Sequence, residues 1–214
     1  MAKPIVYGPG FSTYVRSTLL TLEEKGVDYD LEFVDMLTGA AGTEPHIRRQ
    51  PFAKVPAFHH DGMDLYETVA IMRYVDEAFD GPALQPADAK ARARMEQILS
   101  IVDSYAYDAL IKSCVIPRVV APMVGGETDE AAIGEARPAM TTCVAALNAL
   151  HGDSGGPFLV GDAVSLADLH LTPVYAYFST MPEAELLADA PALRGWWDAM
   201  KSRPSVVATE PELG

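Results

Sequence analysis

The sequence predicts an α/β domain over residues 1–80 followed by an all-α domain over residues 89–214. Three observations favour this division. Strand and helix signals alternate through the first part, a polar and proline-rich stretch covers residues 80–88, and strand signals are almost absent beyond it. With 214 residues and an apolar fraction of 49%, the chain can build compact domains with real cores.

The first domain begins with a predicted strand, helix and strand. The apolar residues 5–7 indicate a strand, which the Gly-Pro-Gly breaker after it ends. Ser12 and Thr13 are typical of a helix N-cap and Gly26 of a helix end. The apolar stripe between them consists of Val15, Leu19, Leu20 and Leu22. Apolar and acidic residues alternate over 29–34, which indicates a half-buried strand.

A hairpin and a helix complete the first domain. Residues 51–58 carry a pair of prolines and are followed by Asp61-Gly62, a hairpin turn signal. A helix is expected from Glu67-Thr68 onward, with an apolar face made of Val69, Ile71, Met72, Val75 and Phe79. The predicted order of elements is therefore βαβ-ββα.

The second domain is predicted to be entirely helical. The alanine-rich residues 89–112 place Met95, Ile98, Leu99 and Val102 on one side, and further helices are expected over residues 129–151, 165–180 and 191–202. Two prolines and two glycines within residues 116–126 indicate a break or a kinked helix there.

The charge balance and the lack of long apolar runs exclude several classes of protein. Lysine and arginine number 16 against 30 acidic residues, so the net charge of −14 is opposite to what a nucleic-acid binder needs. No run approaches the ~20 apolar residues of a membrane-spanning helix. The amino terminus lacks the apolar core of a signal peptide, so we expect a cytoplasmic protein.

The two cysteines, Cys114 and Cys143, both lie in helical patterns. They form no Cys-x-x-Cys motif, and no histidine stands at a spacing suited to zinc, so no metal site is expected. A free cysteine in a helix usually serves as a small apolar residue, and a redox or nucleophilic role is the alternative.

Five segments spread over nearly the whole chain resemble the glutathione transferase family. They are residues 6–13 (VYGPGFST), 22–29 (LEEKGVDY), 51–58 (PFAKVPAF), 65–71 (LYETVAI) and 161–168 (GDAVSLAD). The first-domain segments are most similar to the phi-like, serine-type enzymes of plants and bacteria. The resemblance implies a thioredoxin-like first domain that binds glutathione, a helical second domain that contributes to the second-substrate site, and a homodimer.

Ser12 is the expected catalytic residue. It aligns with the serine that hydrogen-bonds the glutathione thiolate in serine-type members, and it stands at the predicted start of a helix. A hydroxyl donor and the positive end of a helix both stabilise a thiolate. Thr13 is the rival hydroxyl, followed by Tyr14, and a purely structural helix cap is the alternative role of Ser12.

The glutathione-binding residues implied by the resemblance are Lys54, Val55, Pro56, Glu67 and Thr68. A cis peptide at Val55-Pro56 would present the Val55 backbone to the cysteinyl part of glutathione as an added strand does. Glu67 and Thr68 would hold the γ-glutamyl end at a helix start, and Lys54 the glycyl carboxylate. A trans proline, a plain helix cap and a solvated surface lysine are the respective alternatives.

The stretch before the cis-proline motif departs from the family pattern. Phi-like enzymes usually offer a histidine-lysine pair there, whereas this chain has Gly39-Ala40-Ala41-Gly42. Recognition of the glycyl carboxylate would then fall to Lys54, to backbone groups, or to His46, Arg48 or Arg49.

The second substrate, a small electrophile, is expected between the domains, although its candidate contacts could equally be core residues. These candidates are Phe11, Leu37, Tyr105, Tyr107, Ile111, Cys114 and Met123. Ser165 and Asp168 form a variant capping box with a structural role, and His170 beside them is expected to be a core or surface histidine.

Three functions compete on this scaffold. The first is conjugation of glutathione to an electrophilic carbon, and the second is a glutathione-dependent disulfide reductase or isomerase. The reductases carry cysteine where Ser12 stands, and residues 11–13 do not match the serine-serine-cysteine run of the isomerases. The third is a non-catalytic glutathione-binding or scaffold protein. A pure scaffold would need neither Ser12 nor Pro56 nor the Glu67-Thr68 pair. The homodimer is expected to use Arg73 and the helix from Met95 to Val102.

Overall fold

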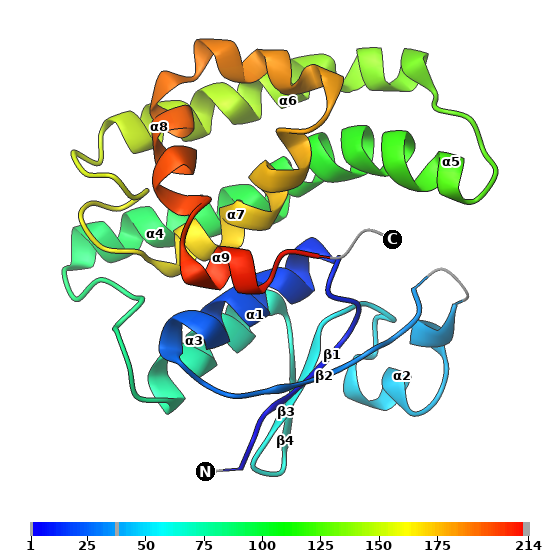
Figure 1. Ribbon diagram of the computed structural model, residues 1–214, viewed down its shortest axis with the longest axis vertical. Helices are drawn as coiled ribbons and strands as arrows, with labels where there is room; N and C mark the ends of the chain where they lie inside the picture. Colours follow the sequence, from blue (N-terminus) through cyan, green and yellow to red (C-terminus); the bar gives the residue numbers. More distant parts are fainter. Residues whose placement is uncertain (1, 37–38, 212–214) are drawn as a thin grey trace. The chain divides into compact units, whose positions relative to one another are not determined.

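A computed structural model describes residues 2–36 and 39–211 (Figure 1). The chain forms two compact units. One is Pro86–Lys201, and the other joins the residues up to Gln85 with those from Ser202 on. The sequence alone assigned the whole stretch 89–214 to the second domain, so the packing of the last described residues with the first unit is a new feature.

The first unit is built on a four-stranded mixed sheet with strand order β2-β1-β3-β4. Its strands are β1 (Ile5–Tyr7), β2 (Asp30–Glu32), β3 (Ala57–His60) and β4 (Met63–Tyr66). β1 pairs in parallel with β2 and antiparallel with β3, which continues into the β3-β4 hairpin. Together with its helices, this unit confirms the predicted thioredoxin-like βαβ-ββα domain.

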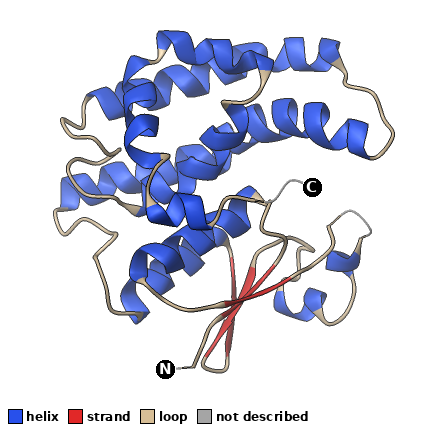
Figure 2. Ribbon diagram, in the orientation of Figure 1, coloured by secondary structure: helices blue, strands red, loops and turns tan. Residues whose placement is uncertain are grey.

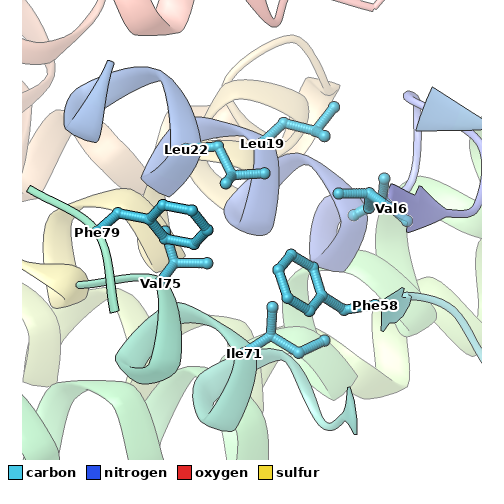
Figure 3. Close-up of a cluster of buried hydrophobic side chains, with 8 residues drawn as sticks. Val6, Leu19, Leu22, Phe58, Ile71, Val75 and Phe79 are labelled. Carbon is cyan, nitrogen blue, oxygen red and sulfur yellow. The ribbon is translucent and has the colours of Figure 1, made fainter. Parts of the chain in front are cut away.

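Helices α1 (Thr13–Lys25) and α3 (Thr68–Ala78) pack side by side against the sheet. Their apolar stripes meet the sheet in one buried cluster (Figure 3), made of Val6, Val15, Leu19, Leu22, Phe58, Ile71, Val75 and Phe79. Gly26 ends α1 in the left-handed conformation, with φ of 67°. Two short helices, η1 (Ala40–Gly42) and α2 (His46–Arg49), lie between β2 and β3.

The second strand is shorter and more exposed than predicted. It covers three residues, and all of them are exposed, with Leu31 at 42%. Phe33, which the half-buried pattern included, lies beyond the strand and is 69% exposed. The alternation was misleading because β2 is an edge strand that pairs with β1 alone.

The C-terminal helix α9 (Pro204–Ala208) is held against α1 by two polar groups. The buried Arg16 donates to the Val206 carbonyl at 3.1 Å. About two turns further along α1, Glu24 accepts two hydrogen bonds from the Arg203 guanidinium, at 2.9 and 2.8 Å. This segment therefore belongs to the unit that contains the sheet.

The second unit is helical, as predicted (Figure 2). Its elements are α4 (Ala89–Ile101), the π-helix η2 (Val102–Val120), α5 (Ala121–Met123), α6 (Glu130–Gly152), α7 (Leu166–Phe178), η3 (Pro182–Asp189) and α8 (Pro191–Met200). Almost every side chain of α7 is buried, so this helix forms the centre of the unit. Of the two expectations for residues 116–126, the break is not found at Pro117, because helical turns continue to Met123.

Within the described residues, no helix combines the length and the apolar character needed to cross a membrane. The same residues contain no group of three or more His, Cys, Asp or Glu side chains that could hold a metal ion.

Candidate functional site

The turn between β1 and α1 brings the start of α1 close to the segment before β3. Gly8 has φ of 150°, and a Cβ built on it would lie 2.5 Å from Val15 Cγ2 and 3.0 Å from Val55 Cβ. Only glycine fits between these two side chains. The sequence analysis used this glycine as a strand breaker and did not foresee the close approach.

Ser12 is the N-cap of α1, and its hydroxyl group retains a free donor. Its backbone is extended (φ −67°, ψ 129°), and its Oγ accepts a long hydrogen bond of 3.5 Å from the Val15 N–H. That bond uses one lone pair and leaves the hydroxyl proton, for which no acceptor is found among the described residues. Ser12 is half-buried, whereas the rival Thr13 is only 7% exposed.

The segment before β3 presents an unpaired stretch of backbone. The Val55–Pro56 peptide is cis, as the resemblance implied. Neither the N–H nor the C=O of Val55 forms a hydrogen bond with another residue in the described part of the chain. The neighbouring Lys54 differs, because its N–H donates to Gln50 Oε1 at 3.2 Å and its C=O contacts His46 Nε2 at 2.7 Å.

The start of α3 is an open helix terminus. Glu67 stands at the N-cap position with φ of 71° and ψ of 111°, and its side chain forms no capping hydrogen bond. A positive φ at a residue with a Cβ costs about 1–3 kcal/mol, and such conformations gather at functional sites. Thr68 begins the helix and is 7% exposed. The N–H groups of this first turn suit an anion.

Among the cations considered for the glycyl carboxylate, three have partners in the structure. Arg48 forms an ion pair with Glu44 at 2.8 Å, and the Arg49 guanidinium lies 4.2 Å from the centre of the Tyr7 ring. His46 contacts the Lys54 carbonyl. The exposed Lys54 side chain forms neither an ion pair nor a hydrogen bond within residues 2–36 and 39–211.

The candidate contacts for the second substrate differ in exposure. In the first unit Phe11 is 42% exposed, and Leu37 lies outside the described residues. In the second unit Tyr105 and Met123 are exposed and Tyr107 is half-buried, with burial raising its pKa. Ile111 and Cys114, by contrast, belong to the buried core, as the alternative interpretation of these residues held.

Cys114 is part of a buried polar cluster in the second unit. Its Sγ donates to Glu183 Oε2 at 3.3 Å, and burial together with this carboxylate raises the pKa of the thiol to about 12. Arg118 donates to the same Oε2 through Nε at 2.8 Å. A thiol so strongly held in the protonated state is unsuited to nucleophilic chemistry near neutral pH. Burial also raises the pKa of Cys143.

The Ser165–Asp168 pair forms a capping box whose carboxylate is completely buried. Asp168 Oδ2 accepts from the Ser165 N–H at 2.8 Å and the Ser165 hydroxyl at 2.7 Å. Its Oδ1 accepts from the Leu159 N–H and from Trp196 Nε1, both at 2.8 Å. Burial raises the pKa of Asp168, and the four hydrogen bonds act in the opposite direction.

His170, near this box in the sequence, is also buried. Its Nε2 lies 2.9 Å from Asp103 Oδ1, so it is a core histidine with a carboxylate partner.

The architecture defines a class of protein in which a thioredoxin-like domain is followed by a helical domain. The family model for the glutathione S-transferase N-terminal domain matches residues 3–77, and that for the C-terminal domain matches residues 63–204. The chain belongs to the glutathione S-transferase family. The resemblance inferred from the five segments, and with it the expected class of enzyme, is confirmed.

Relatives from plants are similar over nearly the whole chain. A probable glutathione S-transferase of Oryza sativa subsp. japonica is 30% identical over 205 residues, covering 94% of this chain and 92% of the relative. The structure of glutathione transferase F7 from Populus trichocarpa is 27% identical with a TM-score of 0.87, covering 96% of this chain and 97% of that one. Both agree with the predicted likeness to the phi class.

A second similar structure contains a ligand. It is glutathione S-transferase I from maize in complex with an atrazine glutathione conjugate, 26% identical with a TM-score of 0.84. The alignment covers 97% of this chain and 96% of that one.

Proposed function

We propose that this glutathione transferase joins glutathione to a small hydrophobic electrophile through a thiolate that Ser12 stabilises. The observation that carries the proposal is the free hydroxyl proton of Ser12 at the start of a 13-residue helix. The sulfur attacks the electrophilic carbon as the thiolate, so its stabilisation in the complex governs the rate.

The energy required is within reach of this arrangement. A free thiol has a pKa of about 8.5, so only a few per cent is thiolate at neutral pH. Lowering that pKa by ~2 units needs about 2.7 kcal/mol of preference for the anion. A hydroxyl hydrogen bond to the sulfur and the N-terminal end of α1 together supply energy of this order.

The remaining open groups of the first unit suit the rest of the tripeptide. We propose that the Val55 backbone pairs with the cysteinyl unit and that Lys54 meets the glycyl carboxylate. Thr68 and the free N–H groups of α3 would bind the γ-glutamyl carboxylate, with Glu67 turned toward its ammonium group. Among the described residues, neither the Val55 backbone nor the Lys54 side chain has an intramolecular hydrogen-bond partner, which supports this assignment.

The set of residues that we propose to contact the electrophile is smaller than the set expected from the sequence. Phe11 in the first unit and Tyr105, Tyr107 and Met123 in the second keep at least part of their surface accessible. Ile111 and Cys114 are withdrawn from this set because they are buried in the core.

The test of the mechanism is a titration of bound glutathione, followed through the ultraviolet absorbance of the thiolate. The wild-type complex is expected to ionise ~2 units below the free thiol. Ser12→Ala should bring the pKa back toward that of the free thiol and lower kcat/KM for a small aryl halide about 100-fold.

Thr13→Val is the matched control, since it removes the neighbouring hydroxyl and should change neither quantity. Loss of acidity in Thr13→Val in place of Ser12→Ala would assign the role to Thr13. A bound thiol no more acidic than free glutathione contradicts the mechanism, and binding without turnover of any electrophile supports a non-catalytic protein.

We propose a cytoplasmic, detoxifying homodimer as the biological form. Phe52 supports an assembly because it is 64% exposed and extends beside Tyr66, with ring centres 6.0 Å apart. The apolar face from Met95 to Val102 is buried within its own unit, so only the opposite face of α4 is open to a partner. Sedimentation analysis of wild type and Phe52→Ser tests this, with dissociation expected for the variant.

A further inference from the structure

A short helix fixes the loop that leads into Val55. Helix α2 and the residue after it contribute two buried side chains, His46 at 4% and Gln50 at 2% exposure. Gln50 Oε1 accepts from the Phe52 N–H at 2.7 Å and the Lys54 N–H at 3.2 Å. His46 Nε2 lies 2.7 Å from the Lys54 carbonyl oxygen. Both backbone polar groups of Lys54 are therefore held by side chains from α2 and the residue that follows it.

The His46 contact has a defined donor. A carbonyl oxygen can only accept, so Nε2 of the imidazole must carry the proton. The other ring nitrogen, Nδ1, is buried and has no partner within the described chain. The ring is thus oriented through a single hydrogen bond, the one to Lys54.

Holding the Lys54 carbonyl also fixes the direction of the Val55 N–H. The six atoms of a peptide unit are coplanar, and in a trans peptide the C=O and the following N–H point in opposite directions. The Lys54–Val55 peptide is not one of the cis bonds. Whatever orients the Lys54 oxygen therefore orients the Val55 N–H, which has no partner among the described residues.

We infer that His46 and Gln50 are positioning residues for glutathione, which hold the Val55 N–H ready for the cysteinyl unit. This inference rests on the proposed function, because the Val55 backbone is assigned there to glutathione. Neither side chain needs to touch the tripeptide. Their effect is expected on the affinity for glutathione and not on the acidity of its thiol, which Ser12 controls.

The test compares two substitutions of equal length at one position. His46→Gln keeps an N–H donor at a similar reach, whereas His46→Met fills similar space with no donor. Binding of S-methylglutathione, which lacks a reactive thiol, is measured by calorimetry. We expect His46→Met to weaken binding about 3- to 10-fold relative to His46→Gln, the range of one hydrogen bond.

Kinetics separate positioning from a general loss of structure. His46→Met should raise KM for glutathione by the same factor while kcat, KM for the electrophile and the pKa of the bound thiol stay unchanged. Thr43→Val, just before the same helix, is the control, because the hydrogen bond from its hydroxyl to the Ala40 carbonyl is exposed, and it should bind as wild type does. Gln50→Met removes the side-chain acceptor of the Lys54 N–H and is expected to weaken binding by the same factor. It tests the inference if His46→Met does not fold.

The outcomes distinguish this inference from the function beneath it. Equal affinities of His46→Met and His46→Gln, or an unchanged affinity of a folded Gln50→Met, overturn the positioning role alone. Failure of the wild-type protein to bind S-methylglutathione overturns the proposed function and this inference together.

Discussion

The helices of the two units differ in how side chains cap the N–H groups of their first turns. In the second unit side-chain oxygens close the starts of four helices. Asp88 caps α4 at 2.9 Å, Asp129 caps α6 at 3.0 Å, Asp168 completes the box of α7 and Asn148 accepts from the first turn of α8 at 3.0 Å. In the first unit the cap of α1 is a long 3.5 Å contact, and α3 has no side-chain cap.

This difference separates stability from function. A good N-cap is worth about 1 kcal/mol, so the long cap contact of α1 and the uncapped start of α3 cost the first unit stability. Open N–H groups and the positive helix end are what bind anions. The second unit uses its own oxygens to stabilise these four starts, while the first leaves those of α1 and α3 available for the thiolate and carboxylate proposed above.

The largest expected effect on stability comes from removing the carboxylate that caps α7, which accepts four hydrogen bonds. Asp168→Ala would leave the N–H groups of Leu159 and Ser165, the Ser165 hydroxyl and Trp196 Nε1 without their acceptor. Because all of these are buried, we expect a loss of about 3–5 kcal/mol in the free energy of unfolding, measured with denaturant. Asp168→Asn keeps one oxygen and should lose less. A loss below about 1 kcal/mol would contradict the structural role.

A second buried carboxylate, that of Glu183, contributes to stability in a way that depends on pH. Hydrogen bonds from Arg118 lower the pKa of Glu183 from 4.5 to about 2. A carboxyl group with a lowered pKa in the folded state stabilises the protein above its unfolded pKa and loses that contribution as pH falls. We therefore expect up to about 3 kcal/mol to disappear between pH 4.5 and 2.

The measurement is the denaturation midpoint of the wild type across this pH range, compared with that of Glu183→Gln. The variant has no titrating group at this position, so its profile should be flatter and the two should converge near pH 2. Profiles that run parallel would show that Glu183 contributes nothing to acid sensitivity.

The structural features that the sequence predicted correctly are those that depend on local patterns of residues. The stripe from Val15 to Leu22 fixes which face of α1 is buried, and the Ser165-x-x-Asp168 spacing predicts a cap, because both act within two turns of helix. The family motifs likewise located Ser12, Val55-Pro56 and Glu67-Thr68 at the ends of elements.

The remaining features join residues that no local pattern connects. Trp196 donates to Asp168 across 28 positions, and Glu183 meets Arg118 across 65. The exposure of Phe33 depends on β2 lying at the sheet edge, which alternation cannot reveal. His46 was considered as a ligand for a carboxylate, but its contact with the Lys54 carbonyl requires the geometry of the loop.

The smallest expected effect is the sharpest test of the comparison, since it applies one substitution to both kinds of helix. Thr68, at the open start of α3, has no described partner for its hydroxyl, whereas Thr172 in α7 donates to the Asp168 carbonyl at 2.8 Å. Valine keeps the branched shape in both places and removes only the hydroxyl. Thr68→Val should therefore weaken glutathione binding about 5- to 10-fold and change stability by less than about 0.5 kcal/mol.

Thr172→Val should do the reverse, with about 1 kcal/mol of stability lost and the affinity for glutathione unchanged. Calorimetric titration and denaturant unfolding of both variants supply the four values. If Thr68→Val binds glutathione as tightly as the wild type, the open start of α3 does not receive the γ-glutamyl carboxylate through this hydroxyl. If Thr68→Val instead loses stability as Thr172→Val does, the hydroxyl serves the fold, and α3 no longer differs in kind from the closed helices of the second unit.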